Sequence, residues 1–293
     1  MFYLKACINK LNEGEVINII KFQPIIKWSG SKRHLVNEIL AYFPSEIDTY
    51  YEPFCGGASV MFALLHTNIR FNNVICSDIN EELIGMWKLI KENPNEILNS
   101  YEQMWNELNK DDDTERRKEY FYEVRKRFNE SKKPTDFFFL VRTCTNGLIR
   151  YNQKGEFNTS LHFSRKGIDP KRLKKVIEYW NTKLNQFDVK FIVQDYKEIK
   201  PSEKDFIYLD PPYANTKGMY YGSINYSELW DWLRNLKCKY ILSFNGKRGT
   251  TDNTYDVPKD IYSLHKYLKS GRSSFKNLRT QEVEYVSESL YIS

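Results

Sequence analysis

Short apolar runs rich in aromatic and β-branched residues alternate with longer amphipathic stretches along this chain. Runs of this kind, bounded by polar residues, are typical of strands. Six of them occur: TYYEPF (49–54), NVICSD (73–78), VKFIVQD (189–195), DFIYLD (205–210), YILSFN (240–245) and EYVSESLYIS (284–293). Because helical patterns lie between them, the order predicts an α/β fold.

A long segment separates the second predicted strand from the third. From about residue 86 to 130 its pattern indicates charged amphipathic helix, interrupted at ENPNE (92–96) and KDDD (110–113). We therefore predict two domains. Residues 1–88 and 176–293 form a sheet domain, and residues 89–175 form an insert.

Within this insert, TCTNGLIRYNQKGEFNTSL (143–161) alternates like strand around two turn signals, Asn146-Gly147 and Lys154-Gly155. This pattern predicts a hairpin. Its polar, basic and aromatic residues suit contact with a DNA groove. A surface hairpin without a partner explains the same pattern equally well.

Composition adds a modest preference for a polyanionic partner. The chain has 44 Lys and Arg against 38 Asp and Glu, a net charge of +6, and concentrates basic residues at 115–128, 165–175 and 265–279. Such runs attract nucleic acid through counterion release, although each one alone is more often a solvated helix face.

The cysteines and histidines do not indicate a metal site. The five cysteines lie in apolar segments without CxxC spacing, and the four histidines are scattered, which favours reduced structural thiols and no bound metal. The first twenty residues have charges spread among the apolar positions, so we expect neither a signal peptide nor an anchor, and a cytoplasmic protein.

A glycine turn follows the first predicted strand. In EPFCGGASVMFAL (52–64), Gly56 and Gly57 lie where strand passes into helix, so a cofactor could approach the backbone. Asp78 ends the next strand 21 residues after Gly57, close to the ~20-residue offset of the acid that binds a ribose diol in nucleotide-binding sheets. A tight turn with a helix cap explains Asp78 as well, and both roles are compatible if Asn80 is the cap.

The fourth predicted strand ends in Asp210-Pro211-Pro212-Tyr213, at the edge where open α/β sheets bind ligands. The prolines fix the backbone and donate no hydrogen bond, so a carbonyl there is available to accept one. An amine could donate to the Asp210 carboxylate and the Pro211 carbonyl while Tyr213 stacks on its ring. Attack on an activated methyl then depends on orientation and electrostatics.

Together, these motifs resemble the DNA adenine-N6 methyltransferases of the Dam type (α group). The similar segments cover nearly the whole chain, in the family's order: IIKWSGSKRHLVNEIL (25–40), YYEPFCGGASV (50–60), CSDIN (76–80), NGLIRYNQKGEFN (146–158), VQDY (193–196) and LDPPY (209–213). The resemblance implies a Rossmann-like catalytic methyltransferase domain, with residues 89–175 as a target-recognition insert. It also implies S-adenosyl-L-methionine as cofactor and double-stranded DNA as partner.

Residue roles follow from the resemblance. A flipped adenine would be held by Asp210, Pro211, Pro212 and Tyr213. Cofactor contacts would come from Lys27, Trp28, Lys32, Glu52, Phe54, Gly56, Asp78, Asp195, Tyr196 and Asp210. DNA contacts would come from Lys27, Asn146, Leu148 and Arg150. The polar and basic run 271–280 adds Arg272 and Lys276 as candidate phosphate contacts.

Three departures from the family pattern stand in this sequence. Ser-Gly-Ser (29–31) replaces a Gly-Gly pair, Thr145 stands where the family often has an aromatic wedge, and TSLHFSRKG (159–167) replaces a proline-containing stretch. The last two lie in the predicted hairpin, so the resemblance suggests GATC as the target sequence without fixing it.

Two other functions remain open: a methyltransferase acting on RNA or a protein amide, and a catalytically silent DNA-binding homologue. The biological setting is open as well, including whether a cognate restriction endonuclease exists.

Overall fold

The computed structural model describes residues 22–162, 164, 166–212, 224–272 and 285–293, and two short strands at 7–9 and 17–19. For those two strands and for residues 271–272 it describes the backbone. The central sheet has eight strands in the order β5-β4-β3-β6-β7-β10-β9, and β8 pairs with β7. The strands are β3 (Glu46–Glu52), β4 (Arg70–Asp78), β5 (Lys190–Val193), β6 (Phe206–Leu209), β7 (Lys239–Arg248), β8 (Thr251–Asp252), β9 (Leu264–Arg272) and β10 (Tyr285–Ile292).

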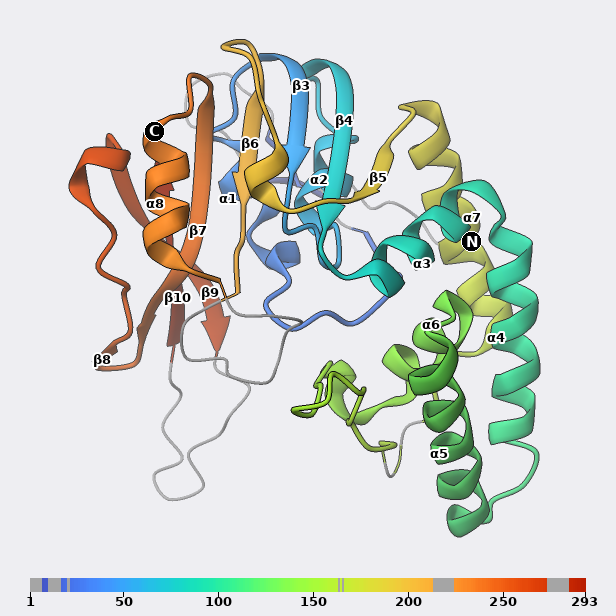
Figure 1. Cartoon of the computed structure of the whole chain (residues 1–293). Coiled ribbons are helices and arrows are strands. Elements are labelled where there is room, and N and C mark those ends of the chain that lie inside the picture. The colour runs from blue at the N-terminus through green and yellow to red at the C-terminus, as the bar shows by residue number, and fades with distance from the viewer. Residues whose placement is uncertain are drawn as a thin grey trace.

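Strand directions identify where this sheet should bind a ligand. The strands β5, β4, β3, β6 and β7 are parallel to their neighbours, whereas β10 runs antiparallel to both β7 and β9. The chain builds outward from β3, first through β4 to β5 and later through β6 to β7, so the order reverses between β3 and β6 (Figure 1). The carboxyl ends of strands at such a reversal flank a ligand crevice. The predicted α/β fold with a Rossmann-like sheet is confirmed.

Successive side chains of β6 pack into different apolar clusters, which shows that the sheet is covered on both faces there. Phe206 and Tyr208 belong to the apolar cluster that also contains α1 (Val36–Leu40) and α2 (Ser59–Leu64). Ile207 and Leu209 belong to a second cluster with α8 (Tyr226–Arg234). Successive side chains of a strand point to opposite faces. Both faces of β6 are therefore buried, which explains its continuous apolar sequence.

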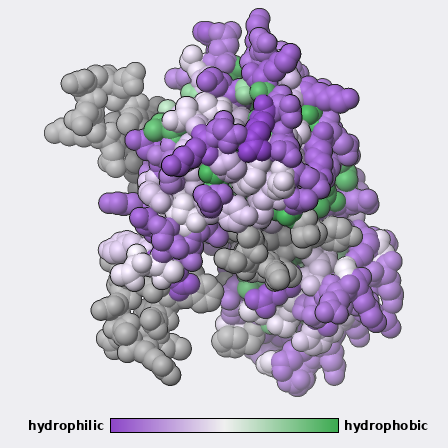
Figure 2. Space-filling model, turned by 60° about the vertical axis from the view of Figure 1, so that its left-hand side comes forward, coloured by the Kyte–Doolittle hydropathy of each residue, from purple (hydrophilic) through white to green (hydrophobic). Residues whose placement is uncertain are grey.

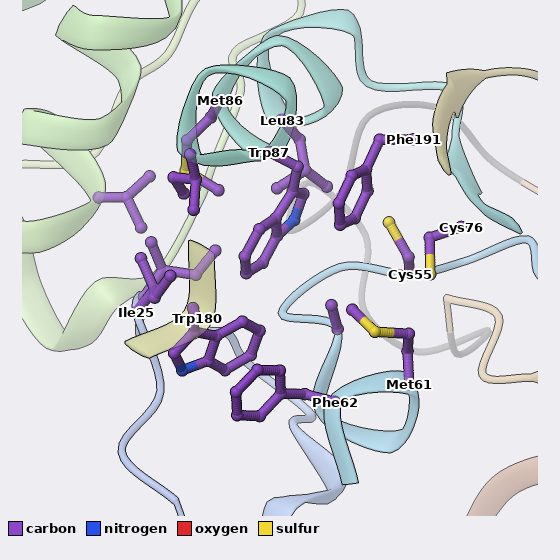
Figure 3. Packing of buried hydrophobic residues seen from close by; sticks show 14 of the residues in the cluster. Ile25, Cys55, Met61, Phe62, Cys76, Leu83, Met86, Trp87, Trp180 and Phe191 are labelled. Carbon is purple, nitrogen blue, oxygen red and sulfur yellow. The ribbon is translucent and has the colours of Figure 1, made fainter. Parts of the chain in front are cut away.

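The larger cluster continues from the sheet into the helices beside it (Figure 3). The rings of Phe62 and Trp180 stack at 3.6 Å, and those of Trp87 and Phe191 at 5.5 Å. Trp87 and Trp180 come from α3 (Glu81–Glu92) and α7 (Pro170–Gln186). Stacked aromatic rings thus join α2, α3, α7 and β5 into one core.

Three further helices stand together on the β5 side of the molecule, away from β9 and β10 (Figure 1). They are α4 (Pro94–Leu108), α5 (Thr114–Ser131) and α6 (Pro134–Thr143). Their boundaries match the predicted interruptions, with Pro94 opening α4 and the Asp113 carboxylate capping α5. The helices α3 and α7 run across the predicted domain borders at 88/89 and 175/176, and the two-domain division stays a prediction.

The predicted hairpin at 143–161 is less regular than its alternation suggests. It begins with the short 3-10 turn η2 (Thr145–Gly147) and makes two isolated antiparallel bridges, Cys144 to Leu161 and Tyr151 to Phe157. The Thr159 hydroxyl donates to the Leu148 carbonyl at 2.8 Å. Side chains therefore replace part of the backbone ladder.

The strand β9 was not predicted, because its residues were counted only as part of the basic run 265–279. Leu268 is buried, whereas Leu264 and Tyr267 are exposed. A strand at the edge of a sheet needs few apolar positions, and charged side chains protect it from unwanted pairing. Its sequence therefore lacks the apolar signal on which the other strands were predicted.

The segment before the first 3-10 helix, η1 (Lys32–His34), is bonded to the helices α6 and α7. The Trp180 indole nitrogen donates to the Gln23 carbonyl at 2.9 Å, and the Arg142 guanidinium donates to the Ile25 carbonyl at 2.7 Å. Residues far apart in the sequence thus fix the path of this segment.

At least three of the six basic residues of α5 are buried or ion-paired within the fold. Arg116 pairs with Asp111 at 2.8 Å, Arg127 pairs with Asp136 at 2.6 Å, and Arg117 is buried. The run at 115–128 is therefore weaker evidence for a polyanionic partner than its sequence suggests.

Hydrophilic residues cover most of the face in Figure 2, with apolar ones in small separate patches. Within the described ranges, no helix combines the length and apolarity that crossing a membrane requires.

Candidate functional site

A cavity of about 300 Å³ lies at the carboxyl ends of the parallel strands, where the reversal of strand order predicts a ligand crevice. It is lined by Trp28, Ser29, Pro53, Phe54, Gly56, Asp78, Ile79, Asn80, Ile149, Tyr151, Asp195, Tyr196, Lys197, Asp210, Pro212, Ile224, Asn225 and Glu228. A smaller cavity of about 40 Å³ adjoins these residues and adds Lys32 and Glu52 to the site. Most of the cofactor residues predicted from the sequence thus line one pair of neighbouring cavities.

The glycine turn after β3 is shaped by a tryptophan. Gly56 has a φ of +45°, and a Cβ added there would lie 2.9 Å from atoms of the Trp28 indole. A Cβ on Gly57 would lie 2.9 Å from the Trp28 Cβ. The Trp87 indole nitrogen donates to the Gly56 carbonyl at 3.0 Å, which fixes the turn from the core side. The glycines therefore make room for Trp28, a role that the sequence analysis did not assign to them.

Asp78 ends β4 with its carboxylate at the main cavity. Its oxygens accept from the Asn80 amide at 3.0 Å and the Gly56 amide at 3.4 Å. Burial raises the pKa of Asp78 to about 6, against the lowering effect of these amides. The Asn80 side chain caps α3 by accepting from the Leu83 amide at 2.7 Å. Asp78 is thus not the helix cap and its carboxylate faces the cavity.

Glu52, the last residue of β3, is buried with an exposed fraction of 3 %. Its Oε2 atom accepts from the Tyr50 hydroxyl at 2.6 Å and from the Met61 amide at 2.7 Å. Burial raises the pKa of Glu52 from 4.5 to about 8 despite these two donors. Near neutral pH this carboxyl group is therefore mostly protonated.

Lys32 reaches across the smaller cavity to Asp210. Its ammonium lies 2.7 Å from both carboxylate oxygens of Asp210 and donates to the Gly30 carbonyl at 2.9 Å. The Lys32 side chain is 2 % exposed, and Glu288 on β10 lies 3.9 Å away. A buried charge requires a partner, and the ion pair with Lys32 fixes the Asp210 carboxylate in one place.

The Asp-Pro-Pro segment after β6 is held by a residue that sequence reasoning missed. The Tyr226 hydroxyl, at the start of α8, donates to the Pro212 carbonyl at 2.6 Å. This bond occupies the Pro212 carbonyl, whereas the acceptor expected from the sequence is the preceding Pro211 carbonyl. Tyr213 lies outside the described residues.

An aromatic wall stands on the other side of the main cavity. The rings of Phe54 and Tyr196 are 5.5 Å apart, and both residues line the cavity. Asp195 caps the 3-10 helix η3 (Tyr196–Glu198) by accepting from the Lys197 amide at 2.9 Å. Ile79, which is 44 % exposed, adds an apolar surface that the sequence analysis did not single out.

Most of the described candidate DNA contacts come together next to this site. Asn146 and Arg150 are exposed, Leu148 is half-buried, and Lys27 is exposed. A Cβ on Gly147 would lie 3.1 Å from the Lys27 carbonyl, so the two segments are packed together. For Arg272 only the backbone is described, and Lys276 lies outside the described residues.

Two residues of the predicted insert that the sequence analysis passed over also line the main cavity. They are Ile149, which is 7 % exposed, and Tyr151, whose hydroxyl accepts from the Asn80 amide group at 3.1 Å. The strand-like alternation at 143–161 could have predicted this, because it places residues 149 and 151 on the face opposite to that of residues 148 and 150.

Comparison with known proteins decides the family. The model of a family described as D12 class N6 adenine-specific DNA methyltransferase matches residues 28–269. The chain belongs to this family. The predicted enzyme class is confirmed, and membership implies DNA as the substrate and, as for methyltransferases generally, S-adenosyl-L-methionine as the methyl donor.

Similar curated proteins agree with this assignment. The Type II methyltransferase M.MjaIII of Methanocaldococcus jannaschii is 36% identical over 209 residues, which cover 66% of this chain and 70% of that protein. The DNA adenine methylase of Serratia marcescens is 31% identical over 201 residues, which cover 66% and 68%. The resemblance to the Dam type is thereby confirmed.

Among solved structures, the rRNA methyltransferase aviRa from Streptomyces viridochromogenes aligns over 89% of this chain and 83% of its own. Its TM-score is 0.37 at 13% identity.

Proposed function

We propose that this protein transfers the methyl group of S-adenosyl-L-methionine to N6 of an adenine flipped out of duplex DNA. The observation that carries the proposal is the Asp210 carboxylate, held by Lys32 at 2.7 Å beside the main cavity. An amino group placed there meets a fixed hydrogen-bond acceptor next to the space for a methyl donor.

The residues of the two cavities fit that donor. S-adenosyl-L-methionine carries a sulfonium, an ammonium, a ribose diol and an adenine ring, and it would supply an electrophilic methyl when bound. Asp78 can accept from the diol, and Phe54, Tyr196 and Ile79 offer apolar contact to the ring. Lys32 and Lys197 are paired with Asp210 and Glu228, and Asp78 and Asp195 add two further acidic groups to the lining, which suits a cationic ligand.

This chain's residues would act by orientation and charge. The target amine donates one hydrogen to Asp210 and one to the Pro211 carbonyl, which favours a pyramidal nitrogen with an available lone pair. Tyr226 keeps the Pro212 carbonyl occupied and the backbone in place. Lys32 maintains the Asp210 carboxylate as the acceptor. The amine loses its proton after the attack, so no base of shifted pKa is required.

The insert is proposed to read the DNA sequence. Residues 89–175 would act as the target-recognition domain, with Asn146, Leu148 and Arg150 together with Lys27 toward the duplex. The exposure of Asn146, Arg150 and Lys27 and the packing of Gly147 on Lys27 support this assignment. An exposed arginine suits a bidentate guanine contact, and GATC is the first target to test.

The test is transfer of labelled methyl from S-adenosyl-L-methionine to unmethylated duplex DNA, followed by sequencing that maps modified adenines. We expect N6-methyladenine at one short sequence. The Asp210→Ala variant should lose transfer and keep its affinity for S-adenosylhomocysteine nearly intact, because Asp210 chiefly holds the target amine. The exposed Asp231, which pairs with Arg234 on α8, provides the matched control Asp231→Ala.

Three outcomes would contradict the proposal in different ways. Methyl transfer by Asp210→Ala at the wild-type rate would refute the catalytic assignment. Transfer to RNA or a protein amide, with none to DNA, would refute the substrate. Duplex binding without any transfer would identify a silent DNA-binding homologue.

A further inference from the structure

The segment 148–151 has one face on the main cavity and another on the surface proposed to contact DNA. Leu148 is half-buried and Arg150 exposed, whereas Ile149 and Tyr151 line the main cavity. The segment is extended here: Leu148 has a φ of −75° and a ψ of 127°, and Tyr151 forms an antiparallel bridge with Phe157. The Asn158 amide also donates to the Arg150 carbonyl at 2.8 Å. Alternate side chains of an extended segment point to opposite sides. One short piece of backbone therefore separates the cavity from the surface proposed to meet DNA.

The inner face is bonded to the nucleotide-binding end of the sheet. The Tyr151 hydroxyl accepts from the Asn80 side chain at 3.1 Å, and the Asn80 backbone amide donates to Asp78 at 3.0 Å. The carboxylate proposed to bind the ribose is thus two hydrogen bonds away from an insert residue.

The segment 148–151 is held at both ends, and its inner and outer residues alternate along one backbone. The backbone amide of Phe157 donates to the Asn129 side-chain oxygen at 2.8 Å, and the Asn129 side-chain nitrogen donates to the Phe157 carbonyl at 3.1 Å. Phe157 is the bridge partner of Tyr151. At the other end, Gly147 packs against Lys27. A displacement of Ile149 or Tyr151 would therefore be transmitted to Leu148 and Arg150.

We propose that Ile149 and Tyr151 contact the bound cofactor, and that the segment 148–151 makes cofactor binding and target binding mutually dependent. This inference rests on the proposed function. A ligand that fills the cavity fixes the inner face, so the duplex meets an outer face that is already in position. Coupling between two binding equilibria is reciprocal, so the target duplex must raise cofactor affinity by the same factor.

The experiment measures this coupling without turnover. Calorimetric titration gives the Kd of S-adenosylhomocysteine for the whole protein in three conditions: alone, with a duplex carrying the mapped target, and with a duplex of scrambled sequence. For the wild type we expect the target duplex to lower this Kd by about 5- to 150-fold, the usual range of allosteric coupling, and the scrambled duplex to have a smaller effect.

Two variants test the residues. Tyr151→Phe keeps the ring and removes the hydroxyl that accepts from Asn80, and Ile149→Ala removes part of the cavity wall. In both variants, the ratio of the S-adenosylhomocysteine Kd measured alone to the Kd measured with the target duplex should move toward one. Thermal unfolding checks that each variant is folded, and two independent variants keep the test decisive if one is not. Tyr122→Phe is the matched control, because Tyr122 is 40 % exposed on α5.

The outcomes separate the two proposals. Methylation of DNA by the wild type with a Kd ratio of one, or with the same ratio in Tyr151→Phe and Ile149→Ala, would overturn the coupling and leave the proposed function standing. Absence of any methyl transfer to DNA by the wild type would overturn both.

Discussion

The buried carboxyl of Glu52 should make the folded state less stable as the pH rises. Its pKa is raised by burial from 4.5 to about 8, so between these values the group is protonated in the folded chain and ionised in the unfolded one. Folding then takes up a proton. Stability contributed by the neutral carboxyl is complete below pH 4.5 and is lost as the pH rises to about 8.

The size of the effect follows from the same values. At about 1.4 kcal/mol per pKa unit, a rise from 4.5 to about 8 corresponds to about 5 kcal/mol of unfolding free energy. The variant Glu52→Gln removes the ionisation and keeps an oxygen that can accept from the Tyr50 hydroxyl and the Met61 amide. Relative to the wild type, it should gain about 4 kcal/mol between pH 5 and pH 9.

The assay is urea unfolding of both proteins, without cofactor, at several pH values from 5 to 9. Groups other than Glu52 titrate in both proteins, so their contributions cancel in the difference between the two unfolding free energies. If the two curves of unfolding free energy against pH run parallel, Glu52 ionises normally in the folded protein and the reasoning is refuted.

Three further predictions concern the site. Burial raises the pKa of Asp78 to about 6, so the affinity of the wild type for S-adenosylhomocysteine should fall as the pH drops below 6. The Asp78→Asn variant should bind this ligand more weakly at pH 8, and its affinity should not change with pH in this way. A wild-type affinity that calorimetry finds independent of pH would contradict the prediction. Gly56→Ala should lower the unfolding free energy more than Gly155→Ala, because both positions have positive φ but only the first would meet Trp28; equal losses of about 1–2 kcal/mol would indicate backbone strain alone. Arg150→Ala should relax preference at one base pair by about 1–3 kcal/mol in transfer assays, whereas uniform weakening across sequences would identify a phosphate contact.

The sequence predicted those parts of the fold that depend on local pattern. The strands β3 to β7 and the breaks before α4 and α5 follow from short apolar runs and helix-capping residues. The strand β9 was missed because an edge strand with exposed basic residues has little such pattern.

The sequence predicted which residues belong to the site, but not how they are arranged in space. The ion pair between Lys32 and Asp210 joins residues 178 positions apart, and no periodicity reports such a contact. The position of Trp28 over Gly56 and the inward side chain of Ile149 likewise depend on packing between segments far apart in the sequence. Local rules cannot supply these distances.

The bonds from Arg142 and Trp180 to the carbonyls of Ile25 and Gln23 bear on how the protein is made. The Trp180 bond spans 157 residues, which a ribosome adding about 5–20 residues per second needs about 8–30 seconds to synthesise. The segment carrying Lys27, Trp28 and Lys32 therefore leaves the ribosome well before its partners exist. It cannot make this bond until Trp180 has been made, so the catalytic centre is completed only after the whole predicted insert, residues 89–175, has been synthesised.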